Sequence, residues 1–226
     1  MDQRSPVAMH VKQFAFNHYG TNCYVLWEPE SRECAIIDPT AEDFWEADRL
    51  LTYVKDNSLA VKYLLLTHAH VDHLCGARQA TDTYGLPLSL HEEGQPLIAA
   101  ARDMAPMMGF RDDGFDSIPL TFLKEYQHLK LGNEDIECRY VPGHCPGSLC
   151  FVVKSSNMVF TGDALFRFSI GRTDLPGGNY DLLMQRIRSE ILTLDDDYTV
   201  LPGHGEVSTV GDERKFNPFL GGDQWL

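Results

Sequence analysis

Four histidine and aspartate side chains that can bind a metal ion fall within six residues of the sequence. The segment THAHVDH, residues 67–73, follows a predicted strand and leads into a helical pattern. Residues two apart in an extended chain point to the same side, so His68 and His70 are expected to present their imidazoles to one point. Asp72 and His73, at the helix start, are expected to face a second point nearby. Such close spacing is typical of a metal site and rare in an ordinary polar loop.

Three later segments each place a further possible ligand directly after an apolar strand and a glycine. Glycine allows a sharp turn at a strand end and a close approach of the backbone to a bound ion. A single strand-end histidine is more often hydrogen-bonded to protein than bound to metal. Strand ends of an α/β fold assemble sites from distant segments, so all four places are expected to converge. The three segments are YVPGH, VFTGD and VLPGH, which end at His144, Asp163 and His204.

The number of candidate ligands predicts two metal ions. Five histidines and two aspartates are too many for one tetrahedral or five-coordinate ion, but they suit two divalent ions that share a carboxylate. All are nitrogen or oxygen donors, a set that favours Zn and also admits Fe or Mn. Two such cations can lower the pKa of a bridging water towards neutrality. The candidate ligands are His68, His70, Asp72, His73, His144, Asp163 and His204.

The elements that must position these residues alternate between strand and helix patterns. Two sets of strands with helices between and after them predict an α/β fold whose sheets are covered by helices on their outer faces. No linker, low-complexity segment or repeat divides residues 1–226, so a single domain is expected. Strands are predicted at 9–16, 22–27, 33–37, 61–66, 136–141, 149–153, 158–161 and 198–201. Helices are predicted at 42–55, 74–84, 92–104 and 181–192.

Composition excludes several classes of partner. Of the 226 residues, 43% are hydrophobic, enough for a sizeable core, and the net charge of -14 carries no dense basic run. Nucleic acid is therefore not an expected partner. No apolar stretch is long enough for a secretory signal or a membrane span, which predicts a cytoplasmic protein without membrane contact. The sequence carries no signal for a particular oligomeric state.

Six cysteines without a CxxC pair are expected to be free thiols that pack in the core. Cys145 follows His144 directly, and a residue next to a ligand in an extended turn is expected to point away from the site.

With these residues identified, the sequence resembles the metallo-β-lactamase superfamily, and within it the glyoxalase II-like hydrolases, over about residues 20–219. The resemblance implies a four-layer αβ/βα sandwich of two mixed β-sheets flanked by helices. It implies a first metal held by His68, His70 and His144, a second held by Asp72, His73 and His204, and Asp163 bridging them.

Finer features of the resemblance concern the substrate. GDALF at 162–166 and SIGRTD at 169–174 are similar to the glyoxalase II pattern, which implies that Arg172 contacts the substrate. The alternative is an ordinary surface arginine paired with Asp174. The chain departs from glyoxalase II at Asp174, where that enzyme has tyrosine, and no separate C-terminal helical substrate domain is expected. Asp163 stands where β-lactamases of the superfamily usually carry cysteine, which argues against antibiotic hydrolysis.

The mechanism that these features favour is hydrolysis of a small-molecule thioester by a metal-bridging hydroxide. Asp72 is the expected catalytic residue, because its position suits orienting the hydroxide or accepting its proton.

Three alternatives compete with thioester hydrolysis. Persulfide dioxygenases are similar and bind one Fe(II), but they tend to have Gly-Cys-Gly-Arg where this chain has SIGR at 169–172, and the missing cysteine favours hydrolysis. A nuclease of the superfamily would add basic surfaces that this acidic chain lacks. A non-catalytic metal-binding scaffold would be free to lose ligands, whereas every ligand is present here.

Overall fold

Two mixed β-sheets form the framework, and the computed structural model describes residues 8–111 and 114–221. The first sheet has the strand order β1-β2-β3-β4-β5-β6, with parallel pairing from β3 to β6. Its strands are β1 (His10–Phe16), β2 (Thr21–Trp27), β3 (Glu33–Ile37), β4 (Ala60–Leu65), β5 (Leu88–His91) and β6 (Leu120–Leu123).

The second sheet has the order β14-β13-β10-β9-β8-β7, in which only β10 and β13 are parallel. Its strands are β7 (His128–Leu131), β8 (Glu134–Tyr140), β9 (Leu149–Val153), β10 (Met158–Gly162), β13 (Thr199–Pro202) and β14 (Ser208–Thr209). A small hairpin of β11 (Leu165–Phe166) and β12 (Ser169–Ile170) follows β10.

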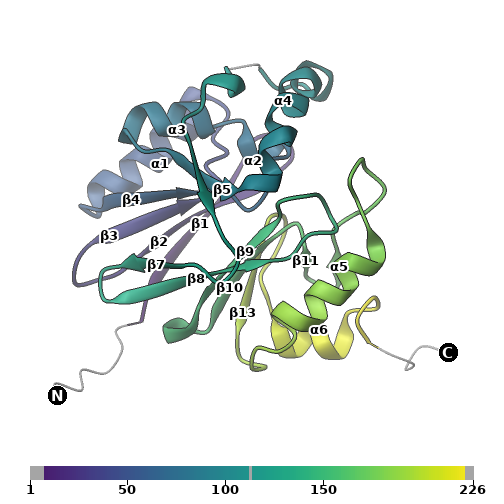
Figure 1. Ribbon diagram of the computed structural model, residues 1–226. Coiled ribbons are helices and arrows are strands. Elements are labelled where there is room, and N and C mark those ends of the chain that lie inside the picture. The colour runs from purple at the N-terminus through teal and green to yellow at the C-terminus, as the bar shows by residue number, and fades with distance from the viewer. Residues whose placement is uncertain (1–7, 112–113, 222–226) are drawn as a thin grey trace.

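Helices cover the outer face of each sheet, as Figure 1 shows. The first sheet carries α1 (Phe44–Asp56), α2 (Val71–Leu74), α3 (Ala77–Tyr84) and α4 (Gln95–Met104), and the second carries α5 (Tyr180–Arg186) and α6 (Val210–Phe216). Short turns complete the chain: η1 (Glu92–Gly94), η2 (Ala105–Met108), η3 (Phe115–Ser117), η4 (Lys154–Ser156) and the π-helical η5 (Ile187–Ile191). Within the described residues, no helix has both the length and the apolar character to cross a bilayer.

Alternating side chains of the central strands fill three hydrophobic layers. In β2, Cys23 and Val25 pack towards the first set of helices, while Tyr24 and Leu26 pack between the sheets. In β9, Phe151 packs between the sheets and its neighbour Val152 packs under α5 and α6. Strands buried on both faces need apolar residues at every position, which explains their continuous hydrophobic runs. The four-layer α/β sandwich expected from the sequence is confirmed.

The predicted strands match the observed ones closely, and three predicted helices are divided. The helix expected over residues 92–104 opens with the turn η1, and α4 begins only at Gln95. The helix expected over residues 74–84 begins earlier as α2 and breaks at Gly76, where a side chain would collide with the backbone of Ala41. The helix expected over residues 181–192 ends in the π-helical turn η5. Several short elements were not predicted: β5, β6, β7, the β11–β12 hairpin, β14 and α6.

The six cysteines are all buried free thiols, as expected from the sequence.

Candidate metal centre

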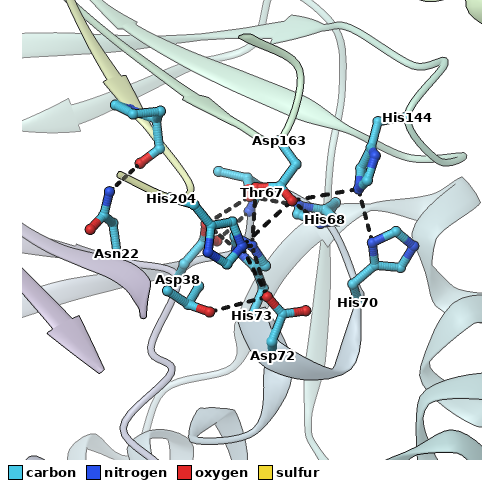
Figure 2. A network of polar contacts seen from close by, with 12 residues as sticks. Asn22, Asp38, Thr67, His68, His70, Asp72, His73, His144, Asp163 and His204 are labelled. Carbon is cyan, nitrogen blue, oxygen red and sulfur yellow. Dashed lines mark hydrogen bonds and ion pairs between the residues drawn. The ribbon is translucent and has the colours of Figure 1, made fainter. Parts of the chain in front are cut away.

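The seven side chains singled out in the sequence meet at the edge where the two sheets adjoin. Each comes from a segment that follows a strand: the loop after β4 together with α2, and the turns after β8, β10 and β13. Figure 2 shows His68, His70 and His144 on one side of Asp163, with Asp72, His73 and His204 on the other. The structure thus brings together all of the candidate ligands, although as many as 136 positions separate the first from the last in the sequence.

Backbone hydrogen bonds between the sheets align these strand ends. Leu149 at the start of β9 donates its N–H to the carbonyl of Thr67, with N and O 2.8 Å apart. Asn22 at the start of β2 donates its N–H to the carbonyl of Gly203 at 2.7 Å. Because each bond joins one sheet to the other beside a candidate ligand, the site depends on the packing of the whole sandwich.

The first group contains His68, His70 and His144. His144 Nε2 lies 2.9 Å from His70 Nδ1, and the donor atoms of all three lie within 4.8 Å of one another. The second group contains Asp72, His73 and His204. His204 Nε2 lies 3.1 Å from Asp72 Oδ2 and 3.3 Å from His73 Nε2.

The carboxylate of Asp163 faces both groups. Its Oδ2 lies 3.7 Å from His144 Nε2 and 3.6 Å from His204 Nε2, so one oxygen is near a nitrogen of each group. Its Oδ1 lies 3.2 Å from His73 Nε2. A carboxylate in this position is suited to joining two cations.

Three imidazoles are oriented by hydrogen bonds from the nitrogen that faces away from the centre. His73 Nδ1 donates to Asp38 Oδ2 at 2.8 Å, and His144 Nδ1 donates to the backbone carbonyl of Arg172 at 2.8 Å. His68 Nδ1 lies 3.1 Å from Thr67 Oγ1, which itself donates to Asp38. In a neutral ring, donation from Nδ1 leaves Nε2 unprotonated and turned towards the centre, as metal coordination requires.

Asp38 is a functional candidate that the sequence analysis missed. It is buried, and it accepts hydrogen bonds from Thr67 N and Thr67 Oγ1, both at 2.7 Å, as well as from His73. A signal for it exists, because Asp38 follows directly on the apolar strand β3 as Asp163 follows closely on β10. No glycine stands between β3 and Asp38, so the pattern of strand, glycine and ligand did not include this residue.

Burial lowers the pKa of the first group of histidines. Burial, followed by the charges of neighbouring histidines, lowers the pKa of His68 well below its usual value and that of His70 to about 4. Burial likewise lowers the pKa of His144, although Asp163 partly opposes it. These rings are therefore neutral near pH 7, the form that binds metal.

In the second group, nearby carboxylates raise the pKa of a histidine in spite of its burial. Burial lowers the pKa of His73, but the carboxylates of Asp163, Asp72 and Asp38 outweigh burial and hold it well above the usual value. Burial raises the pKa values of Asp72 and Asp163, but the nearby histidines, His73 first, bring both below the usual range. The carboxylates thus remain ionised and favour positive charge at this point.

The residues fit a divalent metal centre on two structural grounds. Within the described part of the chain, the buried Nε2 of His68 has no hydrogen-bond partner, which costs about 1–3 kcal/mol unless another group satisfies it. Ligand atoms around a tetrahedral Zn²⁺, at bond lengths of about 2.0–2.2 Å, lie roughly 3.4 Å apart. The separations within the second group, 3.1 to 3.5 Å, are close to that spacing.

Gly203 shows why a glycine precedes a candidate ligand. A Cβ at this position would collide with Asp163 Oδ1 and lie 2.7 Å from His73 Cε1. Only glycine lets the backbone before His204 pass this close to the centre. The role expected for glycine at this strand end therefore has a concrete steric basis.

Arg172 contributes through both its backbone and its side chain. Its carbonyl orients His144, while its guanidinium forms a bidentate pair with Asp174, with both N–O distances 2.8 Å. Both side chains are mostly exposed, 60% for Arg172 and 69% for Asp174. The pair with Asp174, the alternative raised from the sequence, is therefore present. Arg172 also lines a cleft beside the metal centre.

The expectation for Cys145 is wrong. Its Sγ belongs to the group of donor atoms formed with His68, His70 and His144, all within 4.8 Å of one another. The expectation assumed an extended chain, but residues 143–147 form a bend and a turn, so side chains there do not alternate. The thiol lies 3.3 Å from Ser148 Oγ, and burial raises its pKa to about 12. The thiol would have to lose its proton to bind a metal ion.

Comparison with known proteins gives a family match over most of the chain. The model of the metallo-beta-lactamase superfamily matches residues 17–204. Hydroxyacylglutathione hydrolase GloC of Haemophilus influenzae is 35% identical over 94% of this chain and 98% of its own length. Probable metallo-hydrolase YqgX of Bacillus subtilis is 35% identical over 89% of this chain and 92% of its own length.

Two solved structures are similar in both sequence and fold. The BLEG-1 B3 metallo-beta-lactamase superposes with a TM-score of 0.82 at 34% identity, over 94% of this chain and all of its own. TTHA1623, solved in a di-iron-bound form, superposes with a TM-score of 0.81 at 31% identity, over 92% of this chain and all of its own.

The position of Asp38 generates a prediction about metal affinity. Asp38→Asn removes the charge that orients His73, so the Kd for Zn²⁺ should rise about 10–100-fold. Competition with a chromophoric chelator measures the Kd. Asp82→Asn, which changes a surface aspartate paired with Arg78, is the matched control and should leave the Kd unchanged. Unaltered affinity in a folded Asp38→Asn variant would show that Asp38 does not support the metal centre.

Proposed function

The chain belongs to the metallo-β-lactamase superfamily, a superfamily of metallo-hydrolases, and from that premise we propose that it hydrolyses a small-molecule thioester with two divalent cations. The observation that carries the proposal is the carboxylate of Asp163, which faces a nitrogen of each of two ligand groups.

We assign the two groups to two ions. His68, His70 and His144 would hold the first, and Asp72, His73 and His204 would hold the second, with Asp163 shared between them. Each ion would then have three residues of its own and a share in the Asp163 carboxylate, a donor set that suits a divalent cation. A relative 31% identical over nearly the whole chain was solved in a di-iron-bound form, which supports two ions. Zn suits the nitrogen and oxygen donors, and Fe or Mn suits them as well.

When bound, the two cations would supply Lewis acidity that lowers the pKa of water and polarises a carbonyl. We assign to Asp72 the orientation of the attacking water and the acceptance of its proton. Its Oδ2 is 3.1 Å from the hydroxyl of Thr21, which donates to it, so the carboxylate is fixed in place. Asp72 also lines the cleft beside the centre, where a substrate has access to it.

A thioester suits this set of residues because its leaving group needs little help. Thiols have pKa values near 8.5, so a thiolate departs without prior protonation by the protein. Hydroxyacylglutathione, named in the relative that is 35% identical over nearly the full length of both chains, is a thioester. The proposal places the substrate in the same chemical class without requiring the same thiol.

Loss of Asp163 should remove the activity. Asp163→Ala takes away the one carboxylate shared by both groups, so thiol release from S-lactoylglutathione should fall below detection and bound metal should decrease. Asp103→Ala, at an exposed aspartate paired with Arg102, is the matched control. A folded Asp163→Ala variant that keeps both activity and metal would contradict the assignment.

Assays of the unmodified protein on several substrates distinguish the competing activities. Thiol release without oxygen uptake supports hydrolysis, whereas oxygen consumption with glutathione persulfide would favour a dioxygenase. A chromogenic β-lactam belongs in the same panel, because BLEG-1 is 34% identical and is named a β-lactamase. Turnover of the β-lactam in preference to thioesters would contradict the proposal.

Arg172 is the proposed substrate contact. Its pair with Asp174 is exposed, and exposed pairs are weak, so a substrate carboxylate can replace Asp174. Arg172→Ala should raise KM for S-lactoylglutathione about tenfold while kcat changes less than twofold, since a bond to a charged group contributes about 1.5–3 kcal/mol. Arg167→Ala, at an exposed arginine paired with Glu206, is the control. A fall in kcat with unchanged KM would contradict a binding role.

A further inference from the structure

A cleft of about 300 Å³ adjoins the candidate metal centre. Its floor is formed by five of the seven candidate ligands, so any molecule that fills it touches the site where the chemistry would take place. Those five are His70, Asp72, His144, Asp163 and His204.

The walls of the cleft are apolar. One wall is α4, which presents Leu97, Ala100 and Met104 to the cleft, and the turn η2 extends it with Met108. Leu175 and Pro176, from the loop before α5, form the facing wall. Methionine side chains adapt to ligands of different shape, which suits a surface that receives a flexible apolar group.

Charged groups are scarce on these walls. Apart from the floor and the phenol of Tyr19, Arg172 is the only ionisable residue among the described residues that line the cleft. Its guanidinium, paired with Asp174, can accept at most one substrate carboxylate in exchange. A substrate arm with several charges, such as a tripeptide with two carboxylates and an ammonium, would find a partner for one carboxylate and lose hydration at its other charges. An apolar arm loses no hydrogen bonds and gains contact along α4.

We propose that this cleft binds an unbranched apolar arm of the thioester, and that Leu97, Ala100 and Met104 determine this specificity. The inference rests on the proposed thioester hydrolysis and specifies its substrate class. The apolar arm is attached either to the carbonyl carbon or to the sulfur, and two substrate series distinguish these sources.

The first series keeps a neutral thiol, N-acetylcysteamine, and lengthens the acyl group from acetyl through butanoyl and hexanoyl to octanoyl. The second keeps the acetyl group and lengthens an alkanethiol over the same range. In the series whose arm enters the cleft, kcat/KM should rise about fourfold for each added methylene until the cleft is filled, since burial of a methylene contributes about 0.8 kcal/mol. A flat profile in both series would overturn the proposal.

Ala100→Trp fills the cleft from α4, and Ala99→Trp is its matched control. Both alanines are exposed on the same helix, but only Ala100 lines the cleft. Ala100→Trp should reduce kcat/KM for the longest substrate at least tenfold more than that for the acetyl substrate. Ala99→Trp should leave both unchanged. Equal effects of the two variants would contradict the cleft as the binding site.

A second pair of variants keeps the test valid if the tryptophan variants do not fold. Met104→Glu places a charge on the apolar wall, whereas Met107→Glu changes a methionine that is 88% exposed and lies outside the cleft. Only Met104→Glu should reverse the preference for long chains. Retention of the chain-length preference in a folded Met104→Glu variant would overturn the proposal.

Binding without turnover provides a separate readout. The octyl thioether of N-acetylcysteamine cannot be hydrolysed, and calorimetry with the metal-bound protein should show binding that Ala100→Trp weakens and Ala99→Trp does not. The failures are distinguishable: no hydrolysis of any thioester contradicts the proposed function, whereas hydrolysis without chain-length dependence contradicts only the apolar cleft.

Discussion

The structure depends on bringing five imidazoles and two carboxylates, all buried or half-buried, to one point between two sheets. Such a cluster is unfavourable unless the groups satisfy one another or a cation, because buried polar groups lose their hydration. Asp163 relieves this conflict, since its carboxylate approaches the nitrogens of both groups within 4 Å. Gly203 makes this position of the carboxylate possible, because a side chain there would collide with Asp163. The sandwich supplies the rigid edge on which the arrangement rests.

Rigidity at this edge comes from a layer of supporting contacts behind the candidate ligands. Asp38 lies at the end of β3 and accepts hydrogen bonds from Thr67 and His73. It therefore fixes the segment that follows the neighbouring strand β4. The carbonyl of Arg172 does the same for His144 from the loop after β12. Because these partners fix which nitrogen carries the proton, they determine the metal-binding face of each ring and not only its position.

Much of the candidate site was predictable from the sequence, since it follows from strand ends and local spacing. Strands buried on both faces, such as β3 and β9, are continuous apolar runs, and their bounds were predicted without error. The short strands β5 and β6 were missed because their pairing depends on partners distant in the sequence. Asp38 was missed because no glycine separates it from its strand, and the apolar cleft was missed because contacts between segments far apart in sequence leave no local pattern.

The central claim is that the chain holds two metal ions that share Asp163. Elemental analysis of protein purified without added metal, together with an accurate protein concentration, tests it most directly. The account predicts two equivalents of Zn, Fe or Mn per chain. A single equivalent that does not increase on addition of Zn²⁺, or no bound metal at all, would contradict it.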